Sequence, residues 1–186
     1  MKPGKMWDQG DTIKVDVCAS NATSFAPKLN GTMASADEGL TPTLRRWTID
    51  VSGSTNTVAE EMLDDMACEF PRTDDRFMTR NHRHAYLVGG HDAQLKFTRL
   101  VHYDMATGAR KTWGEEQYLL GEPVFAPRTG AVGEGDGYLL VLAYDQLTAL
   151  SQLLIFPAAD IEQGPVARAK LPLRIPSGFH GIWVGA

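Results

Sequence analysis

Histidines and isolated glutamates are the side chains of this 186-residue sequence whose types could do chemistry. Neutral imidazole is a common metal ligand, and a carboxylate that accepts a hydrogen bond from its other ring nitrogen fixes the tautomer and orients the ring. His180 lies in PSGFHGIWV, between Phe179 and Gly181. Glycine permits close backbone approach and aromatic rings can exclude water, so this pattern suits either a metal ligand or a packed core histidine.

Two glutamates stand in apolar segments rather than in charged runs. Glu69 lies in MACEFPR and Glu122 in LLGEPVFAPR, each close to an aromatic residue, a proline and an arginine. One interpretation is an acid at a strand end that is solvated or pairs with Arg72 or Arg128. The other is an inward-facing acid that accepts a hydrogen bond from a metal-binding histidine.

The other four histidines give weaker patterns. His82 and His84 are two residues apart, which would place both on one face of a strand. The arginines beside them disfavour a bound cation, so we expect the solvated start of a strand there. His91 follows two glycines and is expected in a loop, whereas His102 is expected to pack or hydrogen-bond near the end of a strand.

Composition excludes several classes of protein. The net charge of -5 and the absence of a long basic cluster argue against nucleic acid as a partner. The longest apolar run, 138–144, is far shorter than the ~20 residues of a membrane-spanning helix. Cys18 and Cys68 show no paired spacing, and no secretory signal is evident, so we expect reduced thiols in a cytoplasmic protein. No nucleophile elbow, Walker loop or HExxH motif occurs, and no residue is assigned a catalytic role.

Apolar alternation predicts strands through most of the chain. Ile13, Val15 and Val17 fall on one face of a strand. The segment 137–145 is interpreted as a fully buried strand, and 151–160 as another whose Pro157 places its end at an edge. The segment 58–63 suits a helix or the return strand of a hairpin, and we favour the hairpin.

A weak internal repeat indicates the fold. Asp50, Asp104 and Asp160 each end an apolar strand before a glycine-containing turn, at spacings of 54 and 56 residues. Recurrence at this period in an all-β chain is typical of β-propeller blades, although a sandwich or a barrel would also fit. Three repeats give about three blades, too few to close a ring. The chain is therefore either not a propeller or part of one.

Five linked motifs extend this interpretation. The segments DMACEFPRTDDRF, GEPVFAPR, EGDGYLLVLAYD, SQLLIFPAADIEQGPVARAK and LPLRIPSGFHGIWV resemble the carotenoid cleavage oxygenase family over residues 7–183. LRRWTIDV before EFPRTDDRF is most similar to its bacterial branch that cleaves lignostilbenes. The resemblance implies part of a seven-bladed propeller with Fe(II) on its axis, held by four neutral histidines. His180 matches the fourth ligand, Glu122 the acid that supports it, and Glu69 the acid that supports the third.

The same resemblance implies an oxygenase. Enzymes of the family insert both atoms of O2 across a C=C bond of a stilbenoid or apocarotenoid and release two carbonyl products. The protein mainly supplies orientation and a dry apolar tunnel.

Two departures from the family pattern limit what this chain is expected to do alone. Lys2 stands where the third ligand is expected, and the first two ligands would lie upstream. We therefore expect residues 1–186 to be a single C-terminal segment, inactive alone, that pairs with a complementary N-terminal chain or forms a homo-oligomer. The alternatives are a non-catalytic propeller fragment that self-associates or binds a partner, and a small domain that binds an apolar ligand.

Overall fold

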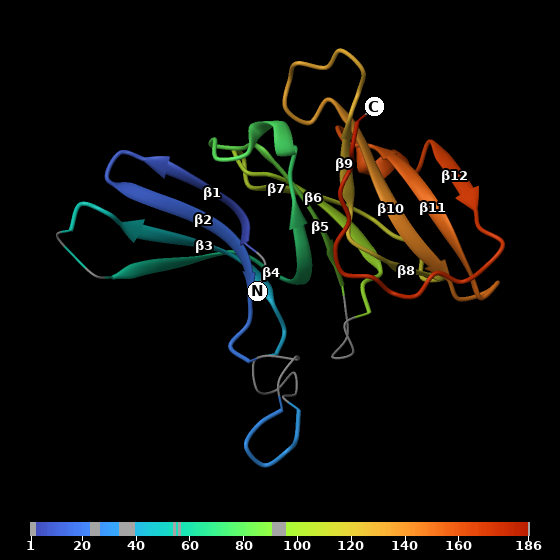
Figure 1. Ribbon diagram of the computed structural model, residues 1–186, viewed down its shortest axis with the longest axis horizontal. Helices are drawn as coiled ribbons and strands as arrows, with labels where there is room; N and C mark the ends of the chain where they lie inside the picture. The colour runs from blue at the N-terminus through green and yellow to red at the C-terminus, as the bar shows by residue number, and fades with distance from the viewer. Residues whose placement is uncertain are drawn as a thin grey trace.

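The computed structural model describes residues 3–22, 27–33, 40–53, 55, 57–90 and 96–185 (Figure 1). The strands are β1 (Pro3–Gln9), β2 (Thr12–Ala19), β3 (Thr43–Asp50), β4 (Val58–Arg72), β5 (His84–Gly89), β6 (Arg99–Asp104), β7 (Ala109–Trp113), β8 (Tyr118–Leu120), β9 (Val124–Pro127), β10 (Gly137–Asp145), β11 (Leu150–Pro157) and β12 (Ala167–Lys170). Lys2 and His91 lie outside the described residues. The predicted all-β class is confirmed.

Helix is confined, over the same residues, to two single turns of 3-10 type, η2 (Asp75–Phe77) and η3 (Ile161–Gln163). Neither has the length or the apolar character to cross a membrane.

The strands form three antiparallel sheets in the described part of the chain. Strands β1 to β7 pair in chain order, and β4 belongs to two sheets because it is fifteen residues long. It pairs with β3 as far as Ala67 and with β5 from Cys68 onward. The third sheet has the order β12-β11-β10-β8, with β9 also paired to β10. The hairpin predicted at 58–63 is confirmed, since this segment returns along β3.

Three of the turns between strands begin with an aspartate that forms the same local hydrogen bond. The carboxylates of Asp50, Asp104 and Asp145 each accept a hydrogen bond from the backbone N–H two residues later, at 2.9, 3.0 and 3.0 Å. This Asx turn reverses the chain at the end of β3, β6 and β10. The prediction that Asp160 also ends an apolar strand was wrong. Asp160 lies three residues beyond Pro157, the last residue of β11, and precedes η3.

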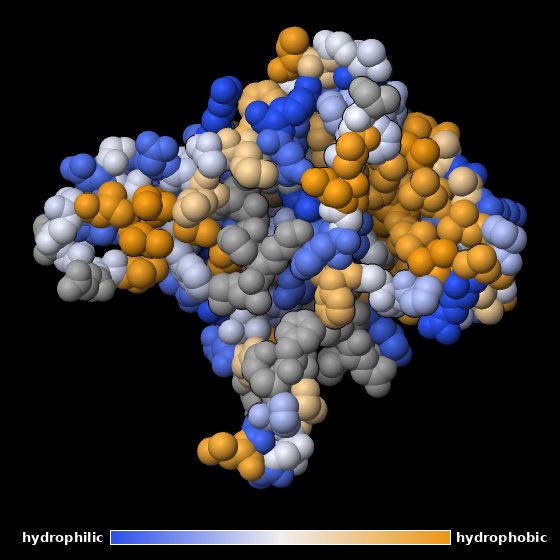
Figure 2. Space-filling view, viewed as in Figure 1, coloured by the Kyte–Doolittle hydropathy of each residue, from blue (hydrophilic) through white to orange (hydrophobic). Residues whose placement is uncertain are grey.

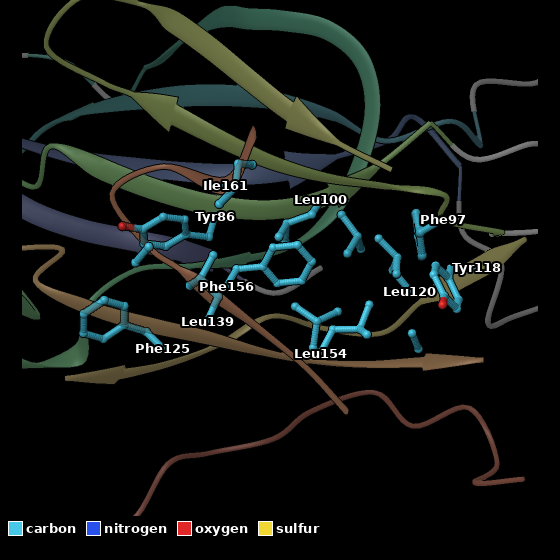
Figure 3. Close-up of a cluster of buried hydrophobic side chains, with 14 residues drawn as sticks. Tyr86, Phe97, Leu100, Tyr118, Leu120, Phe125, Leu139, Leu154, Phe156 and Ile161 are labelled. Atoms are coloured by element: carbon cyan, nitrogen blue, oxygen red, sulfur yellow. The ribbon is translucent and has the colours of Figure 1, made fainter. Parts of the chain in front are cut away.

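The central sheet is buried on both of its faces. Because successive residues of a strand point to opposite faces, Tyr86 and Val88 of β5 pack toward the third sheet, while Ala85 and Leu87 pack toward the first. Figure 3 shows the larger cluster, in which side chains from β5, β6, β8, β10 and β11 point toward one another.

Strand β10 differs from its prediction. Its residues alternate between buried and half-buried, so the interpretation of 137–145 as buried throughout was wrong. Only one face meets the central sheet. Strand β11 lies between β10 and β12, yet Pro157 falls beyond the last residue paired with β12, so its missing N–H interrupts no bond of that ladder.

The first testable prediction concerns this core. Leu139 is fully buried, whereas Leu147 is 77% exposed. Leu139→Ala is expected to lower the free energy of unfolding by about 2–5 kcal/mol, because it removes buried methyl groups and leaves a cavity. Leu147→Ala, the matched control, should change it by less than about 0.5 kcal/mol. Urea denaturation followed by circular dichroism measures both, and equal effects would contradict this packing.

Candidate functional site

His180 and Glu122 meet although 58 residues separate them. The His180 Nδ1 atom lies 3.3 Å from the Glu122 Oε1 atom. The carboxylate thus faces one ring nitrogen, and Nε2 on the other side of the ring is the nitrogen that a metal would take. The side chain of His180 is 52% exposed and that of Glu122 is 3% exposed. The pair therefore joins a buried acid to an imidazole at the surface of the chain.

Glu122 is placed by a break between two short strands. It follows β8 and precedes β9, both of which pair with β10. The other Glu122 oxygen, Oε2, accepts a hydrogen bond from the Gly181 backbone N–H at 2.7 Å. The Arg72 guanidinium lies 3.8 Å from Oε1. A buried carboxylate needs such donors, and here they come from β4 and from the segment after β12.

Both interpretations of Glu122 describe part of its surroundings. It lies near Arg72, as the ion-pair interpretation expected, and it also faces the imidazole of His180. Arg128 pairs instead with Asp136, at 2.9 Å.

Glu69 and His180 both line a cavity of about 860 Å³. This volume falls within the range of small-molecule pockets. Most of its lining is apolar, with Phe70, Phe97 and Leu142 among the larger contributors. Figure 2 shows hydrophobic residues gathered over the sheet of β10, β11 and β12, beside which the C-terminal segment runs in Figure 1.

Phe70 is a site residue that sequence reasoning missed. It adopts a φ of 55° inside β4, which is uncommon for a residue other than glycine. Its N–H donates to the Glu69 Oε2 atom at 3.2 Å, and its ring lies edge-on to His180 with centroids 5.9 Å apart. The pairing of β4 with β5 is irregular between Glu69 and Arg72. In the sequence, the EFPR motif could have indicated Phe70 as a site residue, because this aromatic residue lies between Glu69 and a proline.

The remaining described histidines lie in other places. His82 is 4% exposed and its Nε2 lies 3.4 Å from the Asp16 carboxylate, so the expected solvated position was wrong. Long-range partners bury it, namely Asp16 on β2 and Trp7 on β1, whose ring lies edge-on to it. The ring of His102 stacks on Tyr86, and its Nε2 atom lies 3.0 Å from the Nδ1 atom of His84. The prediction that His102 packs or hydrogen-bonds is confirmed. Over the described residues, no group of three or more histidine, cysteine, aspartate or glutamate side chains could hold a metal ion.

Comparison with known proteins gives matches over nearly the whole chain. A family model described as RPE65, retinal pigment epithelial membrane protein, matches residues 4–185. Lignostilbene-alpha,beta-dioxygenase isozyme III of Sphingomonas paucimobilis is 34% identical, over 97% of this chain and 40% of that protein. Isoeugenol monooxygenase of Pseudomonas nitroreducens is 31% identical, over 96% of this chain and 40% of that protein. The chain thus spans about 40% of the length of these curated relatives.

Solved structures also match nearly the whole of this chain and only part of their own length. Lignostilbene dioxygenase of Pseudomonas brassicacearum superimposes with a TM-score of 0.90 at 29% identity, over 99% of this chain and 41% of that chain. Cobalt-substituted ACO of Synechocystis gives a TM-score of 0.88 at 26% identity, over 100% of this chain and 39% of that chain. The three sheets correspond to part of these propellers, which confirms the predicted fold class.

The second testable prediction concerns the histidine pair. Burial, together with the nearby His84 and Lys111, lowers the pKa of His102 from 6.5 to about 4. Between these two values the unfolded chain takes up a proton at this site and the folded chain does not, so acidification from pH 6.5 toward 4 destabilises the fold. The slope contributed by one such group reaches about 1.4 kcal/mol per pH unit.

His102→Phe removes this titration and keeps a ring against Tyr86. Its free energy of unfolding should fall less steeply than that of the unmodified chain between about pH 6.5 and 4.5, measured by urea denaturation. A comparison at pH 8 separates any packing loss from the pH effect. Parallel pH profiles for the two proteins would contradict the assignment.

The third testable prediction concerns Glu122. Glu122→Ala removes the acceptor of the Gly181 N–H, so exchange of that amide with solvent should accelerate about ten- to a hundredfold. Glu122→Gln retains an acceptor oxygen and should have a smaller effect. Exposed Glu116 provides the matched control, Glu116→Ala, with unchanged exchange at Gly181. Hydrogen exchange read by NMR measures all three, and an unchanged Gly181 rate in Glu122→Ala would refute the anchoring of the C-terminal segment.

Proposed function

Because the chain belongs to the RPE65 family of carotenoid cleavage oxygenases, we propose that it is the C-terminal part of a non-haem Fe(II) dioxygenase. The proposed reaction cleaves a C=C bond of an apolar stilbenoid or apocarotenoid with O2 and yields two carbonyl products. The named relatives include a lignostilbene dioxygenase and an apocarotenoid oxygenase, and these two names define the range of proposed substrates.

The His180–Glu122 pair is the observation that carries the proposal. The Nδ1 atom faces a buried carboxylate at 3.3 Å, which is the arrangement that orients a metal-binding imidazole and raises its basicity. The proposed ligand atom is Nε2. Bound Fe(II), completed by three further neutral histidines, would supply the chemistry that activates oxygen.

Glu69 and the cavity support the rest of the assignment. We assign to Glu69 the support of the third iron ligand, because Glu69 and His180 line the same cavity. Phe70, Phe97 and Leu142 would hold an apolar substrate and exclude water beside the metal. This chain would therefore contribute one ligand, its orienting acid and one wall of the substrate site.

A partner polypeptide follows from the proposal, because one histidine cannot hold iron against water. The surface around His180 is suited to such a partner. Phe179, Ile182 and Val184 are 56%, 74% and 77% exposed, which is unusual for a run of apolar side chains beside a polar site. A complementary N-terminal chain is the proposed partner, and the chain is proposed to be inactive alone. No residue of this chain is proposed to act as a general acid or base.

The same exposed residues favour a second candidate, a non-catalytic propeller fragment that self-associates or binds a partner chain as a scaffold. It requires the apolar contact and no iron. We propose a cytoplasmic location for either form, in agreement with Cys18 and Cys68, which are free thiols although their sulfurs lie 3.8 Å apart.

The fourth testable prediction separates these candidates. The chain is loaded anaerobically with Fe(II), alone and mixed with the N-terminal part of a lignostilbene dioxygenase relative. Stoichiometric iron and cleavage of a stilbene are expected in the mixture, and His180→Ala should abolish both. Glu122→Gln should weaken iron binding about ten- to a hundredfold. Glu116→Gln, the same change at an exposed acid, should leave it unchanged.

Iron that binds equally to the unmodified chain and to His180→Ala would overturn the proposed role of His180. Tight association with no iron in either protein would instead support the scaffold. The association itself is measured by analytical ultracentrifugation, so the two readouts are independent.

A further inference from the structure

Arg174 brings a positive charge to the cavity. Its guanidinium carbon lies 4.6 Å from the centroid of the Tyr144 ring, and both residues line the cavity. No ion pair of Arg174 occurs within the described part of the chain. Four other arginines of that part also stack on aromatic rings, and each of them pairs with an aspartate or glutamate: Arg46, Arg76, Arg128 and Arg168.

The register of β10 places Arg174 and His180 at separate levels of the same cavity. Ser151, which pairs with Tyr144, donates its N–H to the Leu173 carbonyl, so Arg174 lies at the level of Tyr144. Val124 pairs with Leu140 and lies against Gly181, so His180 lies near the level of Leu140. Four strand residues at ~3.3 Å each separate these levels by about 13 Å.

Stacking on Tyr144 holds the guanidinium plane and so reduces the freedom that a bound group must remove. The planar guanidinium has donors spaced for the two oxygens of a carboxylate. We propose that Arg174 and Tyr144 form the end of the cavity that binds the carboxylate of an elongated apolar ligand, whose other part extends toward His180. This inference rests on the proposed function and names the feature of the substrate that the site selects.

The fifth testable prediction uses the 186-residue chain without metal. The probes are trans-stilbene-4-carboxylate and its methyl ester, which differ in charge at one end. Calorimetric titration should give about fivefold tighter binding of the acid than of the ester, the upper range for an exposed ion pair. The preference should fall to less than about twofold in Arg174→Gln and be partly retained in Arg174→Lys, which keeps the charge without the planar fork. Added salt should reduce it.

Arg80 is exposed and does not line the cavity, so Arg80→Gln is the matched control and should leave the preference intact. Equal binding of acid and ester, or binding of neither, would overturn the subsite. So would an equal loss of both in Arg174→Gln, which would mean that Arg174 only shapes the cavity. An acidic side chain of a partner polypeptide is the competing occupant, and it predicts that the preference for the acid is lost when the N-terminal part of a relative is bound. None of these outcomes affects the iron test of His180, so the two proposals fail separately.

Discussion

A buried carboxylate must be surrounded by donors, and Glu122 meets this requirement with groups from distant parts of the chain. Gly181 and His180 come from the segment after β12, and Arg72 comes from the end of β4. One acid thus joins the third sheet, the central sheet and the C-terminal segment. The position of the half-exposed imidazole depends on these contacts and on the ring of Phe70, which lies edge-on to it.

Packing of the sheets creates the cavity that His180 lines. The central sheet is covered on both faces, and the inner face of β10 meets it through Leu139, Val141 and Ala143. The outer face of β10 carries half-buried Leu142 and Tyr144, against which the C-terminal segment lies. Regular alternation therefore separates a tightly packed side from a side with a cavity. The strand needs no special residue to do this, since its period of two is sufficient.

Local patterns predicted the strands and the turns, and long-range contacts explain the errors. The alternation of Ile13, Val15 and Val17 and the hairpin of β3 and β4 followed from neighbouring residues. His82 was misplaced because its burial depends on Asp16, on a strand more than sixty residues earlier. The meeting of His180 with Glu122 could be predicted only through resemblance to a family, because no local signal joins two residues that lie 58 positions apart.

The candidate site lies where the hydrogen-bonded ladders are interrupted. Glu69 and Phe70 occupy the irregular pairing of β4 with β5, and Glu122 lies in the break between β8 and β9. His180 and Arg174 belong to the coil after β12. In a regular ladder each side chain is directed to one of two packing faces, so it cannot turn toward a point between sheets. An interruption releases one or two residues from that rule. The regular strands then fix the positions of the interruptions, and the interruptions direct polar groups and rings to a common space.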